Sequence, residues 1–256
     1  MILLKIMNIT KINSLKKEIL NVAYTAGEGH IASSFSILDI LWVIFDKLLK
    51  KNEYNNFILS KGHGCLALYA MLYEKKLIHK KDFYSFCSLG SNLGGHPDKN
   101  KLKYITASTG SLGHGLPISV GIALAEKINK TNKKIFCLIG DGETNEGTIW
   151  ESFLLASNHK LNNLVCIMDH NHSNDRALNL GDMKSKLLAF GWIFSEINGH
   201  SHDDIFKIMS KKTNFPHFIL ANTIKGYGIK DMENNPAWHH RVPNDLELKM
   251  MIKELD

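Results

Sequence analysis

The sequence predicts an α/β fold, with a mostly parallel sheet that carries helices on both faces. Four short apolar runs, IFCLIG, NLVCIMD, WIFSEI and FILANT, follow one another in the second half of the chain, separated by segments of helical periodicity. Strands that alternate with helices pair in parallel, and strands that are apolar throughout are buried on both faces. The 256 residues suffice for a sizeable core, and we expect a single domain over residues 1–256.

The first half of the chain predicts helices that surround glycine-rich turns. Apolar side chains repeat with a helical period over residues 11–25, and a largely apolar helix is expected over residues 36–50, with Ser36 as its N-cap. The segment FILSKGHG predicts a short strand that runs into a turn and then a helix to about Glu74. Residues 88–110 contain many glycines and predict a long loop.

Further helices accompany the apolar runs of the second half. GLPISVGIALAEKIN precedes the first run, and its small side chains permit close packing against a sheet. Other helices are expected over residues 148–160, 184–190 and 203–212, with a last one from about Asn244. This alternation of helices with apolar runs completes the pattern of a parallel sheet covered on both faces.

The composition argues against a nucleic-acid or membrane partner. The formal net charge is +6, and the lysine doublets are scattered along the chain, as expected for solvated surface rather than a binding stripe. No apolar segment is long enough to cross a bilayer, and Lys5 interrupts the apolar N-terminus. The four cysteines include no CxxC pair, which favours a reducing compartment. We therefore expect a cytoplasmic protein.

Oxygen-bearing side chains follow two successive predicted strands. Asp141 lies between Gly140 and Gly142 directly after IFCLIG, and Asn171 comes two positions after NLVCIMD. The carboxyl ends of neighbouring parallel strands meet at one edge of a sheet, where ligands bind in such folds. Mg²⁺ prefers oxygen ligands and commonly takes one or two from side chains and others from a phosphate. The alternative is an ordinary turn with an aspartate that caps a helix.

Five ordered motifs resemble one enzyme family. GDGETNEG followed by DHN matches the thiamine-diphosphate motif. The other segments, in order, are AGEGHIASS (26–34), LSKGHGCLALYAML (59–72), GGHPD (94–98) with STGSLGHGLPISVGIALAEK (108–127), and ENNPAWHHRVPND (233–245). From about residue 11 to residue 245 the chain resembles the N-terminal, diphosphate-binding half of transketolase. The resemblance implies the thiamine-diphosphate-binding fold of the diphosphate-domain type, with thiamine diphosphate and Mg²⁺ (or Ca²⁺ or Mn²⁺) as cofactors.

The resemblance also implies which residues hold the metal and the cofactor. Asp141 and Asn171 would be metal ligands, with the backbone carbonyl of Ser173 as a third. The residues implied to bind the cofactor lie in the same motifs and are His63, Gly110, Ser111, Leu112, Gly140, Asp141, Gly142, Glu143, Glu146, Asn171 and His239.

Three histidines match catalytic positions of the family. His30, His96 and His239 would bind the oxygens of the sugar or the diphosphate, and Glu146 would lie at the subunit interface between two cofactors. Histidine suits the polarisation or deprotonation of sugar hydroxyls because its pKa lies near neutrality.

The sequence departs from the family pattern at three places. Ile31 replaces the usual proline after the first histidine, and His114 stands where glutamine is usual. The segment between Asn171 and Phe190 is shorter than usual and lacks the customary apolar residue near Ser173. The third departure leaves the role of the Ser173 carbonyl open.

The resemblance implies a transferase that moves a two-carbon ketol unit from a ketose to an aldose. Transketolases need a pyrimidine-binding domain, and in this chain Asp256 follows the last motif closely. We therefore expect the diphosphate-binding subunit of a split transketolase. The pyrimidine-binding and C-terminal domains are expected on a separate chain, in an α₂β₂ heterotetramer that is active only when both subunits are present. The substrates would be sugar phosphates or nucleotide-linked sugars.

Two alternatives remain open from the sequence. The first is the α subunit of a 2-oxo acid dehydrogenase or decarboxylase, which shares GDG and the later asparagine but is not expected to combine GHG, GGHP and AWHH. The second is a cofactor-domain protein that acts as a scaffold without catalysis, for which the shortened segment after Asn171 is the support. Ketose or pyruvate as the donor, and metal-dependent cofactor binding, would distinguish these hypotheses.

Overall fold

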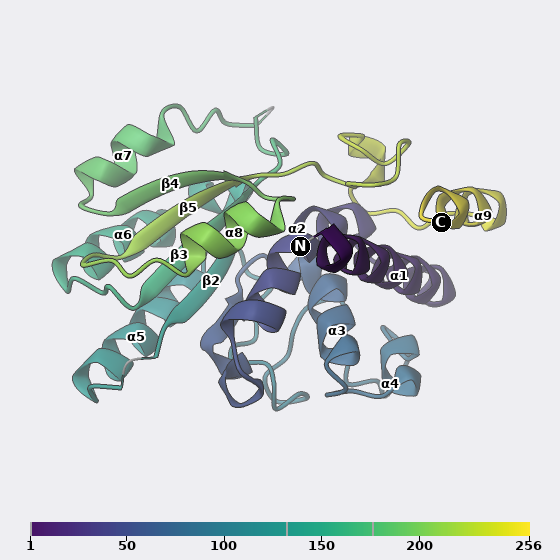
Figure 1. The fold of residues 1–256 in the computed structure, drawn as a ribbon, viewed down its shortest axis with the longest axis horizontal. Coiled ribbons are helices and arrows are strands. Elements are labelled where there is room, and N and C mark those ends of the chain that lie inside the picture. The colour runs from purple at the N-terminus through teal and green to yellow at the C-terminus, as the bar shows by residue number, and fades with distance from the viewer. Residues whose placement is uncertain (1, 132, 176) are drawn as a thin grey trace.

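A five-stranded parallel sheet forms the centre of the molecule (Figure 1). This computed structural model describes residues 2–131, 133–175 and 177–256. Every neighbouring pair of strands is parallel, and the order across the sheet is β1-β2-β3-β5-β4. The strands are β1 (Phe57–Leu59), β2 (Ile135–Gly140), β3 (Leu164–His170), β4 (Ile193–Asn198) and β5 (His217–Asn222). The predicted parallel sheet is confirmed.

Helices cover both faces of this sheet, as the sequence predicted. Side chains that alternate along a strand enter two separate apolar cores, so that Leu138 packs in one and Cys137 in the other. The helices of the first core are α1 (Ile2–Ala26), α2 (Ile31–Val43), α3 (Cys65–Glu74), α8 (His202–Met209) and α9 (Asp245–Glu254). The helices of the second core are α5 (Gly115–Ile128), α6 (Gly147–Asn158) and α7 (Met183–Ala189).

The N-terminal helices differ from their predicted bounds. The second helix, α2, begins at Ile31 and not at Ser36, so the prediction of Ser36 as its N-cap is wrong. Gly29 separates α1 from α2 with a φ of 135°, a backbone conformation that L side chains rarely adopt. Ser36 lies inside α2, where its hydroxyl is committed to a buried carboxylate described below.

Residues 88–110 form a loop, as predicted, and a short helix, α4 (Lys80–Tyr84), precedes it without having been predicted. Asn244 caps α9 by accepting a hydrogen bond from the backbone N–H of Glu247. No helix within the described ranges is both long and apolar enough to cross a membrane.

The aromatic centre of the second core generates the first prediction. Phe153 on α6 is fully buried, with its ring centroid 5.2 Å from that of Trp192 and 5.6 Å from that of Phe218. Phe153→Ala should lower the free energy of unfolding by about 3–5 kcal/mol, because it opens a cavity in a packed core. Leu154→Ala, at the next position on α6 and 59% exposed, should change it by less than about 1 kcal/mol. Urea unfolding measures both, and equal losses would contradict this account of the core.

Candidate cofactor and metal site

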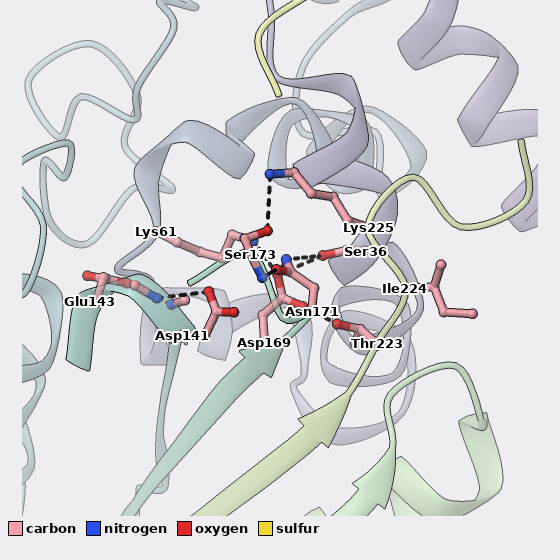
Figure 2. Close-up of polar contacts among 12 residues, drawn as sticks. Ser36, Lys61, Asp141, Glu143, Asp169, Asn171, Ser173, Thr223, Ile224 and Lys225 are labelled. Carbon is pink, nitrogen blue, oxygen red and sulfur yellow. Dashed lines mark hydrogen bonds and ion pairs between the residues drawn. The ribbon is translucent and has the colours of Figure 1, made fainter. Parts of the chain in front are cut away.

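The predicted metal ligands lie at the carboxyl edge of the sheet, after two neighbouring strands. Gly140 at the end of β2 pairs with Asp169 in β3, so Asp141 and Asn171 follow adjacent strand ends. Both side chains are buried, with 4% and 6% of their residue surfaces exposed. Asp141 Oδ1 accepts a hydrogen bond of 2.8 Å from the N–H of Gly142, and its Oδ2 accepts one of 3.3 Å from Asn174 (Figure 2). The parallel register thus brings together the two residues that the sequence predicted to be neighbours.

Beneath these residues, Asp169 collects four donors in a fully buried position. It forms an ion pair with Lys61, which is also buried, and accepts hydrogen bonds from Ser36 at 2.6 Å and from Thr223 (Figure 2). Asn171 Nδ2 is the fourth donor, at 2.9 Å. Burial opposes ionisation, but the Lys61 ammonium and the hydrogen bonds outweigh it and hold the pKa of Asp169 below its usual range. Asp169 therefore remains a carboxylate inside the fold.

This carboxylate determines which way the amide of Asn171 points. Its Nδ2 donates to Asp169 and, at 3.2 Å, to the Ser36 hydroxyl. A carboxylate can only accept, so the NH₂ group must face it and the carbonyl oxygen must face away. That Oδ1 accepts the backbone N–H of Ser173 at 3.1 Å. The side chain of Asn171 is thus held with its oxygen directed out of the buried network, as a metal ligand requires.

Asp141 has the electrostatic environment of a cation ligand. In the part of the chain that the structure describes, no basic side chain forms an ion pair with it. Burial and the neighbouring Asp169 charge raise its pKa. A buried carboxylate without a counter-ion is costly, and a divalent cation would remove that cost. The donor set of one carboxylate and one amide oxygen suits Mg²⁺, Ca²⁺ or Mn²⁺.

Lys225 is a candidate site residue that the sequence reasoning missed. It follows β5 in the segment TIKGYG, and only 7% of it is exposed. Its Nζ lies 3.1 Å from the Ser173 hydroxyl and 2.8 Å from His239 Nδ1. Burial and the nearby Lys61 charge lower the pKa of Lys225. A cation held here would attract an anionic phosphate, and the lysine–glycine pair just after a strand end was the available signal.

Four histidines gather where the N-terminal and C-terminal segments meet. The ring centroid of His30 lies 5.3 Å from that of His63, 5.5 Å from that of His239 and 4.5 Å from that of His240. His240, which the sequence analysis did not single out, also forms an ion pair with Glu28. The structure thus brings together three of the predicted histidines and adds one.

The fourth predicted histidine, His96, lies beside the glycine loop. A Cβ on Gly110 would lie only 3.2 Å from the His96 ring, and Gly110 has a φ of 154°. Ser111 and Leu112 are exposed, and the Ser111 hydroxyl lies 3.4 Å from His114 Nδ1. The backbone at 110–112 is therefore open to a ligand on one side and packed against His96 on the other.

Glu143 is buried and connects three loops of the site. Its carboxylate accepts hydrogen bonds from the Ser60 hydroxyl at 2.5 Å and from the N–H groups of Gly140 at 2.8 Å and Gly113 at 2.9 Å. These contacts hold the GHG turn, the GDG turn and the 110–114 loop in one arrangement. The cofactor-binding role predicted for Glu143 remains a prediction.

Glu146, predicted to lie at a subunit interface, is half-buried at the N-cap of α6. A Cβ on Gly113 would lie 2.5 Å from the Glu146 Cβ, so the glutamate stands against the 110–114 loop. Its interface role remains a prediction.

The departures from the family pattern are accommodated locally. Ile31 is fully buried at the first position of α2, and His114 is the exposed N-cap residue of α5. His114 Nδ1 lies 2.9 Å from the carbonyl oxygen of Leu112 and so helps to shape the cofactor loop. In the segment after Asn171, Ser173 is exposed next to the Asn171 amide, which keeps its carbonyl a predicted metal ligand.

The Lys61–Asp169 pair generates a stability prediction. Lys61→Met should lower the free energy of unfolding by about 3–5 kcal/mol, because it leaves an uncompensated charge in the interior. Lys133→Met is the matched control, since Lys133 forms a 3.0 Å ion pair with Glu126 but its side chain is 50% exposed. That change should cost less than about 1 kcal/mol. Denaturant unfolding tests both variants, and a Lys61 variant as stable as the control would contradict the role of the buried pair.

The histidine cluster generates a prediction about pH. Burial, aided by neighbouring positive charges, lowers the pKa of His63 from 6.5 to about 2 and that of His30 from 6.5 to about 4. Between these values the folded protein binds fewer protons than the unfolded chain, so stability is full above pH 6.5 and falls as the pH drops toward 4. Urea midpoints from about pH 7 to 4 should show this decline.

The variant His63→Asn, which cannot titrate, should flatten that dependence. His79→Asn removes a histidine at the exposed N-cap of α4 and should leave the slope of the wild type. A wild-type midpoint that does not change with pH, or equal slopes in the two variants, would show that the buried histidines are not the cause.

Comparisons with known proteins agree with this geometry. Residues 8–255 match the family described as transketolase, thiamine diphosphate binding domain. One of the subunits of apulose-4-phosphate transketolase from Phocaeicola vulgatus is 33% identical over 255 residues, spanning 94% of this chain and 90% of that protein. The apulose-4-phosphate transketolase subunit of the same name from Actinobacillus succinogenes is 35% identical over 251 residues, spanning 93% of this chain and 91% of that protein.

Among solved structures, transketolase from Campylobacter jejuni is 28% identical and superposes with a TM-score of 0.89. The match covers 96% of this chain but only 42% of the Campylobacter chain. The likeness therefore extends over nearly all of this chain and over less than half of that transketolase. Together with the family match and the relatives, it shows that the chain belongs to the transketolase family, in its thiamine-diphosphate-binding domain.

Proposed function

We propose that this chain is the diphosphate-binding subunit of a transketolase that transfers a two-carbon ketol unit from a ketose to an aldose. The observation that carries the proposal is Asp141, a buried carboxylate without an ion-pair partner among the described residues, next to an Asn171 amide whose oxygen is directed outward. Lys225 and the cluster around His30 flank this pair. The family membership supports the same function, as do the two relatives that are named as transketolase subunits.

The residues of this chain divide the task of holding the cofactor. Asp141 and Asn171 hold a divalent metal, with the Ser173 carbonyl as the third ligand. Lys225 faces the negative charge of the diphosphate, and the open backbone at 110–112 approaches the same group. When bound, thiamine diphosphate supplies the electron sink that allows a carbon–carbon bond next to a carbonyl to break.

The histidines supply hydrogen bonds and proton transfer to the sugar. With pKa values lowered to about 4 and about 2, His30 and His63 are neutral at neutral pH, so each ring can donate one hydrogen bond and accept another. Burial and the Lys225 charge lower the pKa of His239 as well. Neutral rings at this position polarise sugar hydroxyls and accept their protons without adding positive charge to the site.

The proposal includes a partner subunit. We propose that residues 1–256 act as one diphosphate-binding domain and that a separate chain supplies the pyrimidine-binding domain, in an α₂β₂ assembly. Leu112 and Ile118, beside the cofactor loop, are 40% and 39% exposed and would be covered by another subunit. Glu146, against the same loop, would lie at the interface. Sugar phosphates are the proposed substrates, since the names of the two relatives specify a phosphorylated sugar.

The test is ketol transfer by this chain together with whatever subunit co-purifies with it from its own cells. With thiamine diphosphate and Mg²⁺, we expect transfer from a ketose phosphate to an aldose phosphate and no turnover of pyruvate. Asp141→Ala should abolish Mg²⁺-dependent cofactor binding and reduce the transfer rate by at least about 100-fold, because a metal ligand is lost. Asp203→Ala, at an exposed position of α8, is the control and should match the wild type.

Three results would contradict the proposal. Pyruvate decarboxylation without ketol transfer would indicate a 2-oxo acid enzyme. Cofactor binding without turnover of either donor, with the partner present, would favour a scaffold. Full activity of the purified chain alone would refute the need for a second subunit.

A further inference from the structure

We propose that His170, His172 and Asp175 form a second metal site, distinct from the diphosphate metal, that takes a transition-metal ion such as Zn²⁺. Each residue offers one ligand atom, and these atoms lie within 4.8 Å of one another. Two imidazoles and one carboxylate make a three-ligand set that binds transition metals and leaves further positions to water. The inference is independent of the ketol-transfer function.

The outer contacts of His170 prepare it as a ligand. Asn222 Nδ2 donates to Glu196 Oε1 at 2.7 Å, which identifies the other amide atom, Oδ1, as an acceptor. His170 Nδ1 lies 3.1 Å from that Oδ1 and therefore carries the proton. Its Nε2 is left with a free lone pair. A metal-binding histidine typically donates its second nitrogen to an oxygen in this way, which fixes the tautomer and the ring orientation.

His172 and Asp175 complete the set at an open position. His172 Nδ1 lies 2.8 Å from Asp175 Oδ2, and the side chains are 57% and 50% exposed. Ligands about 2.1 Å from a metal and at right angles to each other are separated by about 2.9 Å, so this spacing already suits two neighbouring ligands. The rings of His170 and His172 face each other with centroids 4.2 Å apart. The exposure predicts a site that exchanges metal readily with solvent.

The chain direction separates this site from the diphosphate metal. Asn171 stands between the two histidines in sequence, but its side chain points inward to Asp169 and Ser36 and is 6% exposed (Figure 2). His172 has a φ of 60°, which turns its side chain outward. One short segment therefore presents oxygen to a hard cation on its inner side and imidazole nitrogen to a softer cation on its outer side.

Metal binding at the outer site would restrain the turn at residues 172–175. That turn includes Ser173, whose hydroxyl contacts Lys225, and Asn174, whose N–H donates to Asp141. An ion that ties His170 to His172 and Asp175 would thereby stiffen the loop that borders the diphosphate metal. The ion would act as a positioning element rather than as a participant in ketol transfer.

The experiment is titration of the purified chain with Zn²⁺ by isothermal calorimetry, in saturating Mg²⁺ and thiamine diphosphate so that the inner site is filled. The wild type should bind one zinc ion per chain. His172→Ala and the shape-preserving variant Asp175→Asn should each weaken zinc binding by about tenfold or more, because each removes a direct ligand. Both side chains are exposed, so folding should not change, and circular dichroism checks this.

Two control variants locate the bound ion. His159→Ala removes an exposed histidine at the end of α6 and should bind zinc as the wild type does. Asp141→Ala should also retain zinc binding. The proposal is overturned if the wild type binds no zinc, if the two ligand variants bind as tightly as the wild type, or if Asp141→Ala abolishes binding. The last result would place the ion at the diphosphate metal position.

Discussion

The buried ion pair between Lys61 and Asp169 is the interaction on which the rest of the site depends. Lys61 comes from the turn after β1 and Asp169 from the interior of β3, and Ser36 from α2 and Thr223 from the end of β5 join the same carboxylate. Elements from four parts of the chain therefore meet at one charge. Such a pair is stable only when its remaining hydrogen-bonding capacity is satisfied, and Asn171 supplies the last donor.

This arrangement makes the metal ligand a consequence of the core. The amide of Asn171 has one orientation that avoids placing two oxygens against each other, and that orientation directs Oδ1 outward. Asp141, one strand away, has no such partner within the described ranges and keeps its charge unbalanced. A buried negative charge that is fully paired thus lies beside one that is not, and the unpaired one is where a cation fits.

Positive charge and neutral imidazole complete the pocket from different directions. Lys225 reaches the site from the segment after β5, whereas His30 and His63 reach it from the turns before α2 and α3. Burial removes charge from the histidines but leaves the lysine able to face a phosphate. Phosphate binding and proton transfer are therefore assigned to different side chains, as a reaction on a phosphorylated sugar requires.

The sequence by itself determined the parallel sheet, its helical cover and the meeting of Asp141 with Asn171. Apolar runs and strand-end residues are local signals, and parallel pairing then brings successive strand ends together. The start of α2, the direction of the Asn171 amide, the approach of Lys225 and the inclusion of His240 were decided by the tertiary structure. Each depends on partners far away in the chain, such as Ser36 and Asp169, which are 133 positions apart, and local patterns carry no information about such partners.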